Sequence, residues 1–141
     1  MFLGEFRHTL DAKGRIIIPS KFRESLGDEY VISRGLDGCL FLFPMEEWKS
    51  FEEKLRTLPI TESRAFVRYF TASASDGSVD KQGRALIPQN LRDVANIEKN
   101  AVIIGTPNKL EIWSEELWDQ YMSSDIMSDD NIAKQMEELG F

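Results

Sequence analysis

The chain has few of the side chains from which metal and redox sites are built. Of its 141 residues one is a cysteine, Cys39, and one is a histidine, His8. A single cysteine cannot form an intrachain disulfide, so the composition favours reducing cytoplasm, with Cys39 as a small core residue. Cys39 has no partner at ligand spacing, so the sequence predicts no metal site and no cofactor.

Long apolar segments and a glycine-rich phosphate loop are also missing. No apolar run approaches the roughly 18 residues needed to span a membrane, and no signal peptide is recognisable at the N-terminus. No loop of the nucleotide-binding type is present. With 42% hydrophobic and 29% charged residues, the composition is typical of a globular protein of one domain without membrane contact.

One polar turn occurs twice in the same apolar frame. Residues 10–19 read LDAKGRIIIP, and residues 79–88 read VDKQGRALIP, 69 positions later. The similarity continues through Phe22-Arg23 and Leu91-Arg92, and then at a spacing of 70 as far as Trp48 and Trp118. Similarity at a fixed period indicates a shared supersecondary unit.

We therefore expect residues 1–141 to form a single domain built of two repeats. The repeats cover about residues 1–58 and 71–122, a helical segment joins them, and an acidic tail follows over residues 123–141. Two copies are too few for a solenoid, which needs about three, so a closed pseudo-symmetric domain is expected.

Periodicity and turn residues predict a mixture of strands and helices. In the first repeat we expect strands over 5–10, 15–18, 30–33 and 39–43, and helices over 20–26 and 44–58. In the second we expect strands near 71–79, 84–88, 101–104 and 110–113, and a helix over 114–122. Residues 11–14 should close a short hairpin, and the strand over 15–18 should be buried on both sides.

Three further expectations concern the helices. Ser20 and Thr61 are positioned to cap the helices that they precede. The aromatic stripes at Trp48 and Phe51, and at Phe66 and Phe70, are expected to be core. The tail is expected to be a linker and then a short amphipathic helix through Ile132, Met136 and Leu139, which frays or docks on a neighbouring subunit.

The charge is unevenly distributed. The net charge is −7, but residues 111–141 alone contain nine acids and one base, Lys134. That segment therefore carries −8 and the first 110 residues carry +1, while residues 1–23 carry +3. Because local charge governs which face meets a polyanion, an acidic total does not exclude nucleic acid.

Aspartate and glycine are the residue types that order a tight turn. Asp11 and Asp80 can accept hydrogen bonds from backbone N–H groups two or three residues on. Gly14 and Gly83 can take the positive φ that ends such a loop. These four residues are therefore expected to hold the two turns in one conformation.

The arginine after each glycine is the candidate contact residue. Arg15 and Arg84 carry a planar fork of five donors, which matches a carboxylate, a phosphate or the O6/N7 edge of guanine. Alternatively, each arginine only bridges to its own aspartate, which would stabilise an exposed pair by at most about 1 kcal/mol. The further candidates for DNA contact are the nearby cations Lys13, Lys81, Arg7 and Lys21.

The opening residues 2–23 and the second signature, residues 80–88, resemble the MraZ family. The resemblance covers nearly the whole chain. It implies a pseudo-two-fold, double-psi-like swapped-hairpin β-barrel of the AbrB-like type with peripheral helices. It also implies a bacterial transcription regulator, associated with the nucleoid, that forms a ring-shaped homo-oligomer. The implied targets are G-rich direct repeats in double-stranded DNA upstream of its own division and cell-wall operon. The clearest departures are residues 75–78, which are unusually polar, and the short C-terminus.

Two other function classes were weighed. Two pseudo-symmetric aspartates could form the dyad of an aspartic hydrolase, but an arginine four residues from each disfavours the shared proton that this chemistry needs. A protein-binding, antitoxin-like regulator on the same barrel is the second alternative, although its acidic tail of about 19 residues is short for that role. Binding to promoter DNA separates these classes.

Overall fold

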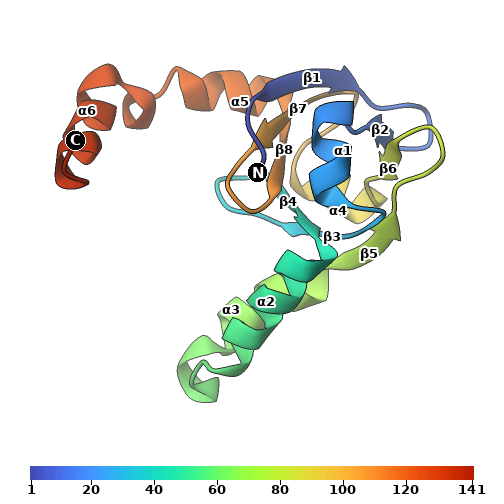
Figure 1. Ribbon diagram of the computed structural model, residues 1–141, viewed down its shortest axis with the longest axis horizontal. Coiled ribbons are helices and arrows are strands. Elements are labelled where there is room, and N and C mark those ends of the chain that lie inside the picture. Colours follow the sequence, from blue (N-terminus) through green and yellow to red (C-terminus); the bar gives the residue numbers. More distant parts are fainter.

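The computed structural model describes residues 1–141 and contains eight strands and six α-helices (Figure 1). The strands are β1 (Glu5–Thr9), β2 (Arg15–Ile17), β3 (Glu29–Arg34), β4 (Leu40–Pro44), β5 (Ser75–Ser78), β6 (Arg84–Leu86), β7 (Asn100–Gly105) and β8 (Leu110–Ser114). The helices are α1 (Ser20–Leu26), α2 (Met45–Arg56), α3 (Ile60–Ser73), α4 (Gln89–Val94), α5 (Glu115–Met122) and α6 (Asp129–Glu138), with a 3-10 turn η1 (Asp125–Met127) before α6. The α+β class is confirmed.

The two halves of the chain exchange their first strands. The main sheet has the order β1-β7-β8-β4-β3-β5, with every neighbouring pair antiparallel. β1 therefore pairs with β7 of the second half, and β5 pairs with β3 of the first half. The predicted hairpin between residues 5–10 and 15–18 is wrong, because β2 leaves β1 and pairs with β6 in a separate two-stranded sheet.

The strands of the main sheet are buried on both faces. Along β3 and β4, alternate residues enter two different cores, as the period of two along a strand requires. Ile32 and Leu42 join the core under β2, β6, α1 and α4, whereas Val31 and Phe43 join an aromatic core under the other helices. The neighbouring β2 differs, because Ile17 is 45% exposed and only Ile16 points inward. The expectation that this strand is buried on both sides is wrong.

Cys39 lies in the aromatic core, as the sequence indicated, and is 2% exposed. Desolvation by burial is the largest cause that raises the pKa of its thiol, to about 12. The thiol therefore stays protonated near neutral pH and behaves as a small apolar side chain.

The helical segment between the halves is an antiparallel pair, α2 and α3, that projects from the body (Figure 1). Trp48 and Phe70 are buried as expected, but Phe66 is 47% exposed. None of the helices is both long and apolar enough to cross a membrane.

Three predicted boundaries are wrong for local reasons. Helices α1 and α3 start directly after Pro19 and Pro59, and neither has a side-chain cap, so Ser20 and Thr61 do not cap them. Proline before a helix already removes one unpaired N–H. Helix α3 continues to Ser73, so the predicted strand near 71–79 is reduced to β5.

The polar sequence of β5 makes room for a tyrosine. Asp76 and Gly77 do not form a hairpin turn, and Gly77 lies opposite Tyr30 in the ladder. A Cβ atom at Gly77 would lie 2.6 Å from the Tyr30 hydroxyl oxygen, so only glycine leaves space for the ring. That hydroxyl accepts a hydrogen bond from the backbone N–H of Leu86 in β6, at 3.2 Å. Tyr30 therefore ties β3 of the first half to β6 of the second.

Tyr30→Phe should lower the free energy of unfolding by about 1–3 kcal/mol, because the N–H of Leu86 loses the partner that satisfies it. The measurement is urea denaturation at neutral pH. Tyr121→Phe is the matched control, since the Tyr121 hydroxyl makes no hydrogen bond to another residue of the chain. Equal stability of the two variants would contradict the role assigned to Tyr30.

Candidate functional site

Each polar turn is held closed by its own aspartate. One carboxylate oxygen of Asp11, Oδ1, accepts hydrogen bonds from the backbone N–H groups of Lys13 (3.0 Å) and Arg15 (2.9 Å). The other oxygen, Oδ2, accepts one from Nε of the Arg15 side chain at 2.7 Å. The backbone donors lie two and four residues on, so the loop is one residue wider than the sequence predicted.

The second turn repeats this geometry. Asp80 Oδ1 accepts from the backbone N–H groups of Gln82 (2.9 Å) and Arg84 (2.8 Å), and Oδ2 accepts from Arg84 Nε at 2.8 Å. Gly14 and Gly83 both have positive φ, +82° and +79°, as expected. Two identical turn structures are therefore present, one from each half.

The pairing of β2 with β6 brings the two turns together. The N–H of Ile18 donates to the carbonyl oxygen of Gly83 at 2.8 Å, and the N–H of Ile87 donates to that of Gly14 at 2.9 Å. Arg84 Nη1 also lies 3.5 Å from Asp11 Oδ2, which forms an ion pair across the two turns. The first and second signatures of the sequence thus form one surface.

Two arginines that the sequence reasoning had not selected complete the site. The side chain of Arg92 packs on Gly14, and that of Arg23 packs on Gly83 of the other half. Nε of each donates to a backbone carbonyl at 3.0 Å, Ile87 for Arg92 and Ile18 for Arg23. The signal that could have found them was the repeat itself, which aligns Phe22-Arg23 with Leu91-Arg92.

The charge balance of the turns excludes a carboxylate dyad. The pKa of Asp11 and that of Asp80 are both lowered, chiefly by the hydrogen bond from the backbone N–H of the following arginine. An aspartic hydrolase needs one carboxyl with a raised pKa to hold the shared proton. Both carboxylates are ionised and paired, so they order the turns. No three His, Cys, Asp or Glu side chains are grouped to hold a metal ion.

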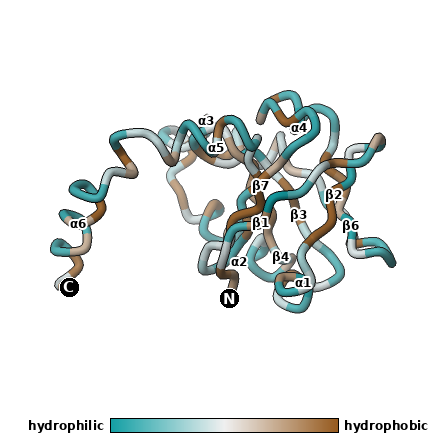
Figure 2. Tube along the Cα trace, turned by 90° about the horizontal axis from the view of Figure 1, so that it is seen from above, coloured by the Kyte–Doolittle hydropathy of each residue, from teal (hydrophilic) through white to brown (hydrophobic).

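Most of the predicted cations lie at this surface. Lys13 and Lys81 are exposed within the turns, and the side chains of Arg15 and Arg84 are 30% and 25% exposed. Lys21 is exposed on α1, with its ammonium group near Gly4. In both views the loops before β2 and β6 lie at the end of the molecule opposite the acidic helix α6 (Figures 1 and 2).

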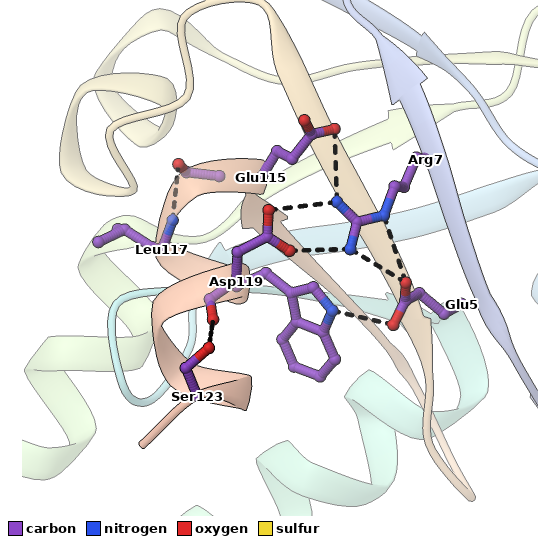
Figure 3. Close-up of polar contacts among 8 residues, drawn as sticks. Glu5, Arg7, Glu115, Leu117, Asp119 and Ser123 are labelled. Atoms are coloured by element: carbon purple, nitrogen blue, oxygen red, sulfur yellow. Dashed lines mark hydrogen bonds and ion pairs between the residues drawn. The ribbon is translucent and has the colours of Figure 1, made fainter. Parts of the chain in front are cut away.

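Arg7 lies in a different environment. Its guanidinium contacts Glu5 at 3.3 Å, Asp119 at 2.9 Å and Glu115 at 3.7 Å (Figure 3). Glu5 is itself held by the indole N–H of Trp118 at 2.9 Å. The structure thus places Arg7 within an acidic cluster that joins β1 to α5, and does not bring it together with the turns.

Known proteins match the chain over almost its full length. One family model, described as "MraZ protein, putative antitoxin-like", matches residues 1–68 and again residues 70–139. A relative in Natranaerobius thermophilus is 55% identical over 141 residues, and one in Clostridium tetani is 54% identical over 142 residues. In each case 99% of both chains is covered, and each relative is named "Transcriptional regulator MraZ".

The class of protein indicated by these matches is a regulator of transcription. The family is shown by the identity and coverage: the chain belongs to the MraZ family.

Gly14→Ala should destabilise the fold more than Gly27→Ala. Both glycines have positive φ, but a Cβ at Gly14 would lie 2.5 Å from Cζ of Arg92, whereas a Cβ at Gly27 meets nothing within 4 Å. The control should therefore lose only the backbone term, about 1–2 kcal/mol. Gly14→Ala should lose about 1–3 kcal/mol more, because Arg92 is displaced from its carbonyl. Urea denaturation measures both, and equal losses would argue against the packing of Arg92 on the turn.

The two turn aspartates should make stability depend on pH in the acid range. Their pKa values are lowered in the folded state, so each carboxylate stabilises the fold above its unfolded value, about 4. That contribution is lost as the pH falls through the lower, folded pKa. Unfolding measured between about pH 5 and pH 2 should show a shallower fall in stability for the double variant Asp11→Asn, Asp80→Asn than for the wild type. An unchanged slope would refute this assignment.

Proposed function

We propose that the protein regulates transcription by binding double-stranded DNA through the surface formed by its two turns, residues 11–15 and 80–84. The observation that carries the proposal is the pairing of β2 with β6, which sets two copies of one arginine-bearing turn side by side. A DNA duplex presents repeated, equally spaced acceptors, so a doubled turn matches it better than a single one.

The guanidinium of Arg15 has donors free for a base. Its Nε is occupied by Asp11, and its two Nη groups make no hydrogen bond within the chain. Paired Nη donors suit the O6 and N7 acceptors of guanine in the major groove. The aspartate thus holds the arginine in a presenting pose, and the bridge and the contact are compatible. Arg84 has the same pose but also approaches Asp11.

The distribution of charge supports approach of DNA from this side. Around the turns the two carboxylates are paired, while the nearby cations Lys13, Lys81, Arg23 and Arg92 form no ion pair. Acidic side chains instead gather near the starts of α2 and α5 and along the C-terminal segment. Long-range repulsion therefore disfavours other orientations of a polyanion, and Lys21 supplies an outer phosphate contact.

We further propose that the targets are short G-rich direct repeats upstream of the protein's own division and cell-wall operon, which would place it at the nucleoid. Two small turns offer little contact per chain. A ring of linked copies on tandem repeats would raise the affinity by about 10²–10⁴ through effective concentration. The interleaved halves and the crossing of β2 with β6 support a pseudo-two-fold swapped-hairpin barrel of two repeats.

The alternative is a protein-binding, antitoxin-like regulator without direct contact to DNA. The wording of the matched family description favours keeping it. A duplex carrying the promoter repeats separates the two, because the alternative gives no difference between promoter and scrambled DNA.

Arg15→Ala should weaken binding to the promoter duplex by about 1–3 kcal/mol per contact and relax discrimination at guanine positions, because the bidentate donors are lost. Arg15→Lys should recover nonspecific more than specific binding, since an ammonium lacks the planar fork. Arg84→Ala should show the same direction of change. Gel-shift titration of promoter and scrambled duplexes measures these differences.

Arg7→Ala is the matched control, because Arg7 is engaged by carboxylates outside the turns. It should keep the wild-type affinity for DNA. In addition, the slope of log K against log salt should fall by about 0.9 for each phosphate contact removed with Lys13 or Lys81. Wild-type affinity in folded Arg15→Ala and Arg84→Ala would reject the proposal.

A further inference from the structure

The C-terminal helix α6 is well capped, yet it stands away from the body of the protein (Figures 1 and 2). The hydroxyl of Ser128 accepts from the N–H of Asn131 at 3.3 Å. At the other end, Gly140 has φ +91° and donates to Glu137, and the N–H of Phe141 donates to the carbonyl of Met136. This pair of bonds is a Schellman motif. Local chemistry therefore defines both ends of the helix.

The apolar side of α6 has no partner. Ile132, Met136 and Leu139 follow the spacing of one helix face and are 46%, 52% and 75% exposed, and no residue of α6 is buried. A helix of 10 residues is too short to persist alone in water and depends on packing of its apolar face. The caps and the exposed stripe together indicate a helix that is formed to dock.

A complementary groove lies on the α2–α3 pair, near its distal turn. It encloses about 240 Å³. Its apolar floor includes Leu55, Leu58 and Val67, and its rim carries Arg56, Arg64 and Arg68 without any acidic residue. Of these arginines only Arg56 has an ion-pair partner, Glu53 at 3.9 Å. The second apolar hollow on the same pair, beside Phe66 and Phe70, includes the acidic Glu47 in its lining and fits an acidic helix less well.

We propose that α6 of one copy docks in the α2–α3 groove of another copy. The stripe Ile132, Met136 and Leu139 would cover the apolar floor. The acids that flank it, Asp129, Asp130, Glu137 and Glu138, would meet the arginine rim. Within one chain the helix and the groove lie apart and project in different directions (Figure 1), so the occupant is a second copy. This contact deepens the proposed ring, because it names the surfaces that join neighbouring subunits.

The geometry of such a contact is head to tail. Each copy donates one helix and accepts one, so a chain of copies closes into a ring whenever the rotation between neighbours divides a full turn. Both surfaces lie away from the two turns, which remain free to face DNA. The acidic tail is neutralised by the neighbour's arginines, so the ring presents less negative charge to the duplex.

The first test is the size of the full-length protein at micromolar concentration, measured by analytical ultracentrifugation. Met136→Asp removes the apolar contact from a helix that touches nothing else, so the rest of the fold is unaffected. Arg64→Glu combined with Arg68→Glu reverses the rim. Each variant should sediment as a single chain, whereas wild type should form one large species. The matched controls Lys134→Gln, on the polar side of α6, and Glu62→Gln, on α3 outside the groove, should keep the wild-type size.

The decisive test mixes the two assembly variants. The Met136→Asp chain keeps an intact groove and the rim variant keeps an intact helix, so together they should form a 1:1 dimer and nothing larger. A single-chain wild type, assembly variants of wild-type size, or a mixture that does not pair would each overturn the proposal. A monomeric wild type would leave α6 to a different protein. Binding to a duplex with one promoter repeat should be unchanged in Met136→Asp, so a failure of assembly is distinguishable from a failure of DNA contact.

Discussion

The structure depends on the antiparallel pairing of β2 with β6, a ladder of only three residues on each side. Ile16 and Ala85 face each other in it and are almost completely buried, so the ladder also forms one wall of the larger core. The backbone bonds on either side of it join each turn to the other half of the chain. Arg23 and Arg92 then pack on the glycines of those turns. Neither half can hold its turn without the other, so folding of the site and of the domain is one cooperative event.

The separation of charge within the chain gives the site its character. A protein with a net charge of −7 would repel DNA if the charge were spread evenly, because like charges raise the energy of approach over a distance of about 10 Å at moderate salt. Here the acids cluster near the helix starts and on α6, and Arg7 is already neutralised at β1. The turns hold their own two aspartates in ion pairs, so the remaining cations define the local field.

Several errors of the sequence reasoning share one cause. The turn at residues 11–14 forms as expected, but its flanking segments pair with the other half, since local turn chemistry does not choose a strand's partner. The strand 15–18 appeared fully buried from its isoleucines, although Ile17 is exposed because β2 has only one packed face. The residues 75–78 looked irregular because the reason for Gly77 is Tyr30, which is 47 positions away in the chain.

Local physics is what the sequence alone determined: two Asp-x-x-Gly-Arg turns, most of the helices, the buried cysteine and the uneven charge. Each of these follows from residues within a few positions of one another, whose hydrogen bonds and periodicity need no distant partner. Only the tertiary structure decided which strands exchange, that the two turns share one surface, that Arg23 and Arg92 support them and that Arg7 is bound elsewhere. Those outcomes follow from burying one core between two halves, since the pairing that buries most apolar surface depends on the whole chain.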